Sequence, residues 1–270
     1  QAHLKNYAPG GHFPSPLPQG GEIEEAVLCW GTENFGHWIF TYLHRLTLLW
    51  HQPELLKLPL LVKNTTPPRF LEWLRVMGFT NIVLGADWIK VKKLWVPSVV
   101  HYRDADAKIY LLPEAVHTFR YLMLGDRLLP CEERTRIFIS RAKSRWRRIL
   151  NEAQLFEYLE KIGVQTVYME DMSLEEQLDC ISRAKLIVMI AGGASPITML
   201  APADCKIVEL TIPILAAVFG SRFWAGILGQ QFHRIEGVPQ GEPHGRKINA
   251  DFTVDVERVK EAIDASFDIE

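Results

Sequence analysis

The sequence predicts an α/β protein with two Rossmann-like halves whose parallel sheets face each other across a cleft. Short apolar strands alternate with amphipathic helices along both halves of the chain, which is typical of parallel sheets covered on both faces. The chain has 270 residues, 48% of them hydrophobic and 23% charged. That length and composition suit one large or two medium globular domains.

The first half begins after residues 1–25, which are rich in Pro and Gly and predict an irregular lead-in. We assign residues 26–130 to a first Rossmann-like domain. Glycines after two of its helical patterns, and prolines before them, mark the helix ends. The expected strands are Glu25–Trp30, Leu58–Val62, Asn81–Leu84, Trp88–Val91 and Lys93–Val96, and the expected helices are Asn34–Leu49, Arg69–Met77 and Pro113–Leu124.

The second half follows a polar crossover at Asp126–Glu133, and we assign residues 131–270 to a second Rossmann-like domain. Its strand patterns are almost continuously apolar, as expected for strands buried on both faces. The expected strands are Arg136–Ser140, Gln165–Tyr168, Leu186–Ile190 and Lys206–Leu210, and the expected helices are Asn151–Ile162, Ser173–Ala184, a helix with Pro196 in its first turn, and Val254–Phe267.

Composition excludes several classes of protein. Thirty basic and 32 acidic residues give a formal net charge of −2, without the broad positive field that nonspecific nucleic-acid binding requires. The cysteines form no Cys-x-x-Cys pair, so we expect no structural zinc. No apolar run reaches the roughly 18–20 residues that cross a bilayer. Asp104-Ala105-Asp106 has a D-x-D pattern, but two acids in a polar loop are common, and we expect no metal there.

A basic loop follows the strand Arg136–Ser140. Ligands of open parallel sheets bind at the carboxyl ends of strands, so a phosphate or diphosphate is the natural partner of this loop. A solvated charge run that pairs with Glu152 or Glu157 is the competing interpretation. Its five cations within eight residues are Arg141, Lys143, Arg145, Arg147 and Arg148.

A second candidate segment is Gly192-Gly193-Ala194-Ser195, between a buried strand and an expected helix. Backbone amides at such a turn can approach an anion at the helix N-terminus. The segment is neither G-x-G-x-x-G nor a P-loop, and a tight turn without a ligand is the commoner explanation of such a stretch.

A third candidate segment, Thr32 to Trp38, follows the first expected strand and opens a helix. It would place Glu33 and His37 at the mouth of the cleft. His37 is a candidate general base, because histidine exchanges protons near neutral pH. A histidine packed beside Trp38 is the competing interpretation.

Together these segments resemble glycosyltransferase family 61 in the order of their motifs. Asn34-Phe35-Gly36-His37-Trp38 resembles the family's N-x-G-H-W helix. Phe138–Arg141 followed by Arg147–Glu152 resembles its Y-I-S-R and R-R-I-x-N-E stretch. Met172–Gln177 and Gly193-Ala194 resemble its M-S-x-x-E-Q and H-G-A segments. The short chain and the Gly-His-Trp form resemble bacterial members, which include capsule and lipopolysaccharide enzymes.

Two positions depart from the family pattern. Gly192 stands where most members have a histidine before Gly-Ala, and Thr41 stands where an acid often follows the histidine of the first motif. The first departure weakens the expected donor contact at that position. The second leaves His37 as the main base candidate, without an acidic helper.

The resemblance implies a GT-B enzyme that transfers a sugar, usually from a UDP-sugar, to a hydroxyl of a glycan or glycolipid, with inversion and without a metal or other cofactor. Residues 26–130 would form the acceptor side and residues 131–270 the nucleotide-sugar side. The location implied is cytoplasmic, with peripheral association at the inner face of the membrane left open.

The same resemblance distributes the site residues between the two domains. His37 would be the catalytic base, with Glu33, Asn34, Gly36 and Trp38 on the acceptor side. The residues expected to bind the donor are Ser140, Arg141, Arg147, Arg148, Met172, Ser173, Gly193, Ala194 and Ser195.

Two functions of other classes fit the same residues. A pyruvyl-transfer enzyme of similar architecture would also use a basic cleft and a histidine, with phosphoenolpyruvate as donor. A non-catalytic module that binds a nucleotide sugar or glycan is favoured by the departures at Gly192 and Thr41. The oligomeric state, the sugar and the acceptor are not encoded in these patterns.

Overall fold

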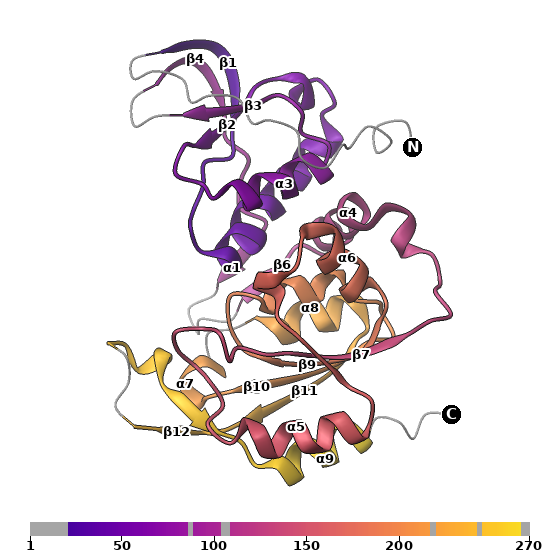
Figure 1. Ribbon diagram of the computed structural model, residues 1–270. Helices are drawn as coiled ribbons and strands as arrows, with labels where there is room; N and C mark the ends of the chain where they lie inside the picture. The colour runs from indigo at the N-terminus through magenta and orange to yellow at the C-terminus, as the bar shows by residue number, and fades with distance from the viewer. Residues whose placement is uncertain (1–20, 86–88, 104–108, 217–219, 242–244, 266–270) are drawn as a thin grey trace. The chain divides into compact units, whose positions relative to one another are not determined.

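The computed structural model describes residues 21–85, 89–103, 109–216, 220–241 and 245–265. The chain divides into two compact units. Unit 1 comprises Gln1–Tyr102 and Tyr110–Asp126, and unit 2 comprises Arg103–Ile109 and Arg127–Glu270. Each unit is built on a parallel sheet of its own (Figure 1).

The sheet of unit 1 has four parallel strands in the order β3-β2-β1-β4. The chain begins in the middle of the sheet, moves outward on one side, and returns to the other side for its last strand, which is the Rossmann-like pattern. The strands are β1 (Glu22–Leu28), β2 (Leu60–Lys63), β3 (Ile82–Gly85) and β4 (Lys90–Trp95).

The helical segment after β1 differs from the single helix expected over Asn34–Leu49. It changes hydrogen-bonding pattern three times, through α1 (Phe35–His37), the π-helix η2 (Trp38–Leu43), α2 (His44–Leu46) and the 3-10 helix η3 (Thr47–His51). The apolar spacing is helical in all four pieces, so sequence periodicity does not separate them.

Two attachments hold this helical segment to the rest of unit 1. The indole Nε1 of Trp38 donates a hydrogen bond to the carbonyl of Phe70 at 3.1 Å, and both side chains are buried. Arg45 donates to the carbonyl of Cys29, at the end of β1. The segment is therefore anchored at both ends of the π-helix.

Two further helices of unit 1 follow the predictions closely. They are α3 (Pro68–Val76) and α4 (Pro113–Leu124), which both begin at proline. The short η4 (Leu55–Lys57) was not expected. The two strands expected over 88–96 are one strand, β4, and residues 86–88 lie outside the described residues. A small ribbon of β5 (His101–Arg103) and β6 (Ile109–Leu111) was not expected.

The sheet of unit 2 has five parallel strands in the order β11-β10-β9-β7-β8. Ile137, Ile187 and Ile207 lie side by side across its three central strands. The strands are β7 (Thr135–Ile139), β8 (Gln165–Val167), β9 (Ala184–Ile190), β10 (Lys206–Thr211) and β11 (Gln231–Glu236).

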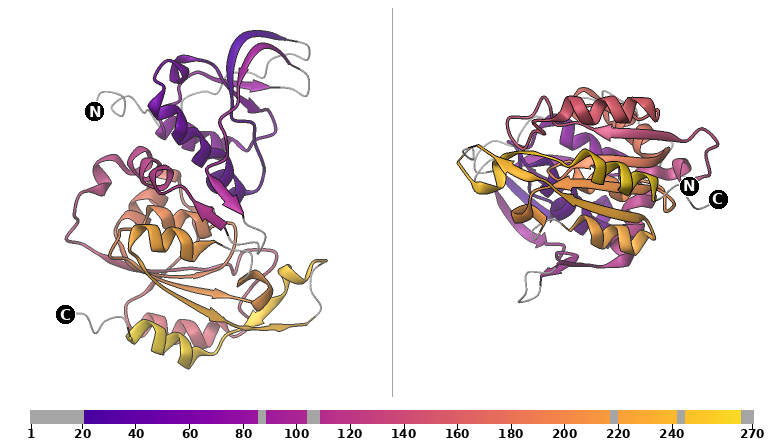
Figure 2. Two further views of the ribbon diagram at one scale, coloured as in Figure 1. Left: turned by 180° about the vertical axis from the view of Figure 1, so that it is seen from behind. Right: turned by 90° about the horizontal axis from the view of Figure 1, so that it is seen from below.

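Helices cover both faces of this sheet (Figure 1, Figure 2). On one face lie α5 (Glu152–Lys161) and α9 (Val256–Asp264). On the other lie α6 (Leu174–Ser182), α8 (Ser221–Leu228) and the 3-10 helix η7 (Ser195–Leu200), which replaces the helix expected at Pro196. The sequence patterns gave no expectation for α8 or β11.

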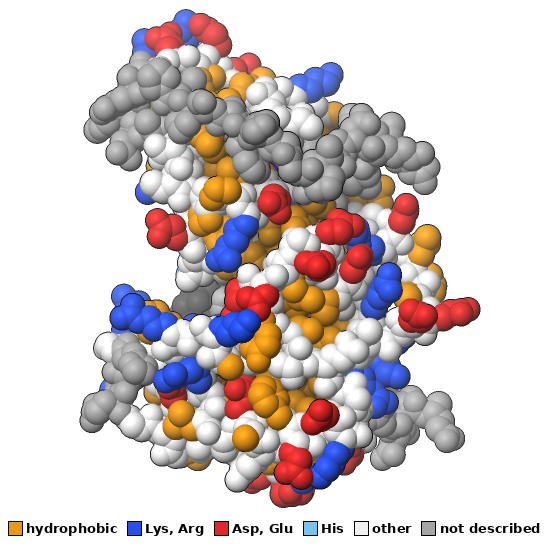
Figure 3. Space-filling model, in the orientation of Figure 1, with side chains coloured by type: hydrophobic (Ala, Val, Ile, Leu, Met, Phe, Trp, Pro, Cys, Tyr) orange, Lys and Arg blue, Asp and Glu red, His pale blue; other side chains and the backbone are white. Residues whose placement is uncertain are grey.

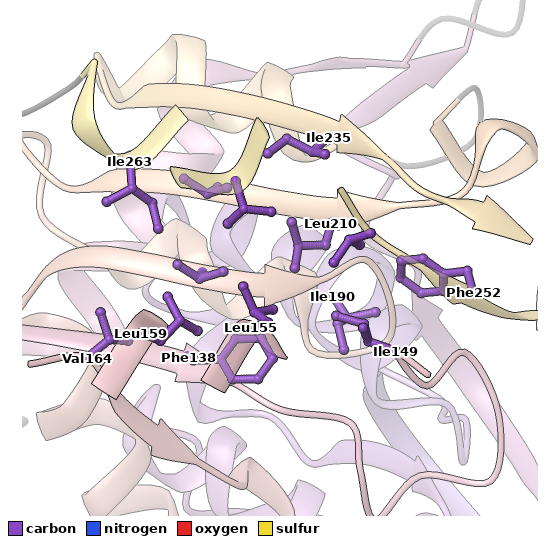
Figure 4. Close-up of a cluster of buried hydrophobic side chains, with 14 of the residues drawn as sticks. Phe138, Ile149, Leu155, Leu159, Val164, Ile190, Leu210, Ile235, Phe252 and Ile263 are labelled. Atoms are coloured by element: carbon purple, nitrogen blue, oxygen red, sulfur yellow. The ribbon is translucent and has the colours of Figure 1, made fainter. Parts of the chain in front are cut away.

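The core under α5 and α9 is formed by apolar side chains from eight elements and their loops, and these side chains point toward one another (Figure 4). Phe138, Leu155, Leu159, Val188 and Val208 are at most 1% exposed. Burying a side chain of this kind contributes about 1.5–3 kcal/mol, so this face of the sheet is a rigid support for the loops at its edge.

Short elements complete unit 2. They are η5 (Gly125–Leu128, at the boundary with unit 1), η6 (Met169–Asp171), α7 (Pro213–Ala216), η8 (Lys247–Asn249), and the antiparallel pair β12 (Val238–Gln240) and β13 (Asp251–Thr253). Because the five main strands are parallel, their carboxyl ends share one edge of the sheet. The loops after β7 and β9 therefore lie side by side.

Candidate active site

The loop after β7 contains cations of two kinds. The first kind is exposed and paired locally: Lys143 forms an ion pair with Asp171 and lies 4.4 Å from the ring centroid of Tyr168, and Arg145 lies 4.9 Å from the ring of Trp146. Over the face of the molecule in Figure 3, acidic and basic side chains are interspersed. An anion site in this loop would therefore involve the cations that lack such partners.

Arg148 belongs to the paired cations as well. Its backbone amide donates to Oδ1 of Asp251 at 2.8 Å, and its guanidinium donates to Oδ2 at 2.6 and 3.1 Å. The carbonyl of Arg148 accepts from the amide of Phe252 at 3.0 Å, and the side-chain amide of Asn151 bonds both backbone groups of Val254. This part of the R-R-I-x-N-E motif thus fastens the loop to β13.

Ser140 is also committed to the loop. Its hydroxyl donates to Oε1 of Glu152 at 2.8 Å and accepts from the amide of Ala142 at 3.0 Å. Burial raises the pKa of Glu152, and the bond from Ser140 opposes that rise. Ser140 and Glu152 therefore join the two ends of the basic loop.

Arg141 is a different kind of cation. Its Nη2 donates to the carbonyl of Trp146 at 3.3 Å, and its buried Nε has no hydrogen-bond partner among the described residues. Burial lowers the pKa of Arg141, and the carboxylate of Glu170 opposes that effect from a distance. A guanidinium in this state is stabilised by an anionic ligand.

Arg147 lies close to Arg141 and shares its situation. Its Nη1 donates to the carbonyl of Ala191 at 3.4 Å, and its buried Nε also lacks a partner within the described part of the chain. Burial, and then the charge of Arg141, lower the pKa of Arg147 to about 10. Its φ of 61° is left-handed, which is uncommon for a residue with a side chain and clusters at functional sites.

The two arginines reach the turn that follows β9. The amide of Gly192 donates to Oγ of Ser195 at 2.9 Å, and the amide of Ser195 donates to the carbonyl of Gly192 at 3.0 Å. Ser195 is fully buried, so its side chain builds the turn. Gly193 and Ala194 are half-buried, and their amides have no acceptor among the residues that the structure describes.

The M-S-x-x-E-Q segment has a structural explanation. Ser173 caps α6: its hydroxyl accepts from the amide of Glu176, whose carboxylate accepts from the amide of Ser173 at 2.7 Å. The side-chain amide of Gln177 donates to the carbonyls of Met169 and Met172 at 2.9 and 3.1 Å. The polar groups of Ser173 are thus occupied within the protein.

In unit 1, the N-x-G-H-W motif also contains residues with structural roles and a residue without one. Asn34 caps α1, because its Oδ1 accepts from the amide of His37 at 3.1 Å, and Trp38 anchors the helix to Phe70. The imidazole of His37 is exposed and makes no hydrogen bond or ion pair with a described residue, and Glu33 is exposed beside it. His37 is therefore not a packing residue beside Trp38.

Comparison with known proteins places these motifs in a family. A family model described as Glycosyltransferase 61 matches residues 35–208, more than half of the chain. The chain belongs to glycosyltransferase family 61. This family 61 member has no significant match among curated proteins.

Solved structures of heptosyltransferases resemble this family 61 glycosyltransferase. E. coli heptosyltransferase WaaC with ADP has a TM-score of 0.50 at 11% sequence identity, over 90% of this chain and 100% of that chain. E. coli ADP-heptose lps heptosyltransferase II has a TM-score of 0.49 at 13% identity, over 90% and 98%. At such identity the likeness concerns the fold. The likeness to WaaC confirms the prediction of an α/β, GT-B-like protein with two Rossmann-like halves.

Sequence reasoning missed the residues that hold the site together. Asp251, which fixes Arg148, is 103 residues away in the sequence and shows no local pattern. Glu152 was considered as an ion-pair partner of the loop cations, but it binds Ser140. Asp104 and Asp106 lie outside the described residues. Within the described ranges, no group of three or more His, Cys, Asp and Glu could hold a metal, and no helix could cross a membrane.

Proposed function

We propose that this family 61 member is an inverting, metal-independent glycosyltransferase that moves a sugar from a UDP-sugar to a hydroxyl of a surface glycan or glycolipid. The observation that carries the proposal is the pair Arg141 and Arg147, two half-buried guanidiniums with unbonded Nε atoms at the carboxyl ends of β7 and β9. Two adjacent cations that form no ion pair with a carboxylate among the described residues match the charge of a nucleoside diphosphate.

In the proposed reaction, the acceptor oxygen forms a bond to the anomeric carbon as the bond from that carbon to the β-phosphate oxygen breaks. The electron pair of the broken bond leaves with UDP, so negative charge grows on the diphosphate. Arg141 and Arg147 would stabilise that charge without a metal ion. The unbonded amides of Gly193 and Ala194 are further donors for the same oxygens.

His37 would take the proton of the acceptor hydroxyl as the new bond forms. The support for this role is elimination within the motif. Asn34 caps the helix and Trp38 anchors it, while the exposed imidazole makes no hydrogen bond, ion pair or ring contact with a described residue. Glu33 and Gly36 would lie on the acceptor side with it. Thr41, in η2, supplies no acid to assist the base.

The donor-side residues divide into binding and supporting groups. Arg141, Arg147 and the Gly193-Ala194 backbone would contact the diphosphate. Ser140, Arg148, Ser173 and Ser195 would act by holding the loops in place, since their polar groups already bond other residues. Met172 offers its carbonyl to Gln177 and has the same supporting role.

Titration calorimetry with UDP tests the proposal. Each charge-assisted contact contributes about 1.5–3 kcal/mol, so Arg141→Ala and Arg147→Ala should each weaken UDP binding at least tenfold. Arg145→Ala, in the same loop but stacked on Trp146, is the matched control and should bind within a few-fold of the wild type. Wild-type affinity in both Arg141→Ala and Arg147→Ala would remove the proposed donor site.

A panel of nucleotide sugars, followed by product analysis, distinguishes the remaining classes. Transfer or hydrolysis of a UDP-sugar with an inverted anomeric product supports the enzyme. Thermal stabilisation by phosphoenolpyruvate but not by UDP would indicate pyruvyl transfer. Binding of a UDP-sugar without any turnover across acceptors would indicate a non-catalytic module.

A further inference from the structure

The space beside Gly192 is filled by one side chain. If a Cβ atom were present at Gly192, its three nearest neighbours would all belong to Arg141: Nη1 at 2.6 Å, Cζ at 3.2 Å and Nε at 3.7 Å. Real Cβ atoms essentially never approach another atom to 2.6 Å. The guanidinium of Arg141 thus lies where any other residue at position 192 would place its side chain.

The backbone does not explain this glycine. Gly163 and Gly229 have φ values of +70° and +72°, which favour glycine whatever surrounds them. Gly192 is not among the positive-φ residues, so an alanine could adopt its backbone conformation. Position 192 needs glycine because the guanidinium of Arg141 occupies the space that a side chain would take.

Arg141, and not the turn, would yield to a side chain at this position. The turn is closed in both directions between Gly192 and Ser195, and Ser195 is fully buried. The colliding atoms, by contrast, are the far end of a flexible side chain. Displacement of the guanidinium would separate it from Arg147, which reaches the carbonyl of the neighbouring Ala191.

We propose that Gly192 is a positioning residue for anion binding: its missing side chain lets Arg141 lie against the end of β9, beside Arg147, so that both guanidiniums act on one diphosphate. This inference rests on the proposed function for the ligand that the pair binds. It also gives a physical meaning to the departure from the family pattern at this position. Here an arginine from the loop after β7 occupies the space of the missing side chain.

A double-mutant cycle in UDP affinity tests the inference, with inorganic pyrophosphate as a second probe that lacks the nucleoside. Gly192→Ala should weaken binding of both probes about tenfold or more, which corresponds to the loss of one charge-assisted contact. In the Arg141→Ala background, Gly192→Ala should cause no further loss, because the group that it displaces is gone. Gly226→Ala in α8, where a Cβ meets open space, is the matched control and should bind as the wild type does.

The outcomes separate the inference from the proposed function. If Arg141→Ala weakens binding but Gly192→Ala does not, the inference is wrong and the donor site stands. If both single variants bind UDP and pyrophosphate normally, the donor site itself is wrong. Equal losses from Gly192→Ala with and without Arg141 would also overturn the inference. If Gly192→Ala melts early, recovery of the melting temperature in the double variant supports the collision with Arg141, and no recovery contradicts it.

Discussion

The carboxylate of Asp251 accepts three hydrogen bonds from Arg148, two from its guanidinium and one from its backbone amide. Arg147, one residue earlier, has a buried Nε without a partner among the described residues and a left-handed backbone. Two consecutive arginines of one motif therefore differ in their roles. Arg148 holds the loop in place, whereas the loop holds Arg147 in a left-handed conformation with its Nε unbonded to any described residue.

Replacement of Arg147 should separate binding from stability. Arg147→Ala and Arg147→Gly should both weaken UDP binding at least tenfold, since each removes one charge-assisted contact. Glycine relieves the left-handed backbone, which costs a residue with a side chain about 1 kcal/mol, so the glycine variant should melt above the alanine variant. Calorimetric unfolding and UDP titration measure the two effects. Two results would contradict this account: a melting temperature of Arg147→Ala above that of Arg147→Gly, or wild-type UDP affinity in either variant.

Replacement of His37 tests the base. A positioned general base contributes roughly 10²–10⁴-fold, so His37→Ala should lower kcat by that order. UDP affinity should stay within a few-fold and the melting temperature should not fall, because the imidazole is exposed and unbonded to any described residue. His117→Ala, an exposed histidine on α4 in the same unit, is the control and should keep full turnover. Near-normal turnover in His37→Ala would end the assignment.

Removal of metal ions should leave the reaction intact. Arginines and backbone amides would carry the charge of the departing diphosphate, so turnover should survive excess EDTA. Asp104→Asn combined with Asp106→Asn should change it little. If turnover strictly required Mn²⁺ and this double variant lost it, the D-x-D segment would instead be established as a metal site.

Acid should destabilise unit 1 through His44. Burial, and then the nearby His101, lower the pKa of His44 to about 3, although the carbonyl of Ile39 opposes them. The unfolded chain binds a proton near pH 6.5 and the folded chain does not, so stability is lost as the pH falls from about 6.5 toward 3. Between pH 7 and pH 5 this group should lower the free energy of unfolding by about 2 kcal/mol.

His44→Leu removes that titration and keeps an apolar side chain beside Phe119, whose ring centroid lies 4.8 Å from that of His44. Denaturant unfolding at pH 7 and pH 5 should therefore show a shallower pH dependence in the variant than in the wild type. Equal dependence in both proteins would show that His44 titrates normally.

The strands of the two main sheets, except β11, and the helices that begin at proline were predictable because their signals are local. Pro113 and Gly125 bracket α4 at the expected residues. The change from α- to π- to 3-10-helix between residues 35 and 51 was not predictable, since all three patterns bury one face at similar spacing. A helix was expected at Pro196, but its 3-10 form, η7, was not predictable, because its residues are all buried and show no amphipathic period.

The candidate site was predictable as a set of motifs but not as a set of roles. Local spacing identified the basic loop and the histidine helix. It could not show that Arg148 pairs with Asp251, that Ser173 caps α6, or that Arg141 fills the space beside Gly192, because each role depends on a partner brought close by the fold. The motif residues whose side chains are not used up by hydrogen bonds or ion pairs to described residues, Arg141, Arg147 and His37, are the strongest functional candidates.

The π-helix η2 restricts the number of residues in its segment of the chain as well as their identities. It lies between two attachments, from Trp38 to Phe70 and from Arg45 to Cys29. Each residue of an α-helix turns the chain by about 100°, and each residue of the wider π-helix turns it somewhat less, so one residue more or fewer would turn Arg45 away from Cys29 while Trp38 stayed in place. Substitutions on the exposed side preserve this angle, whereas an insertion or deletion does not. We therefore expect that natural variants of this protein keep Trp38, Arg45 and the number of residues between them, and differ mainly at the positions between them that are not buried.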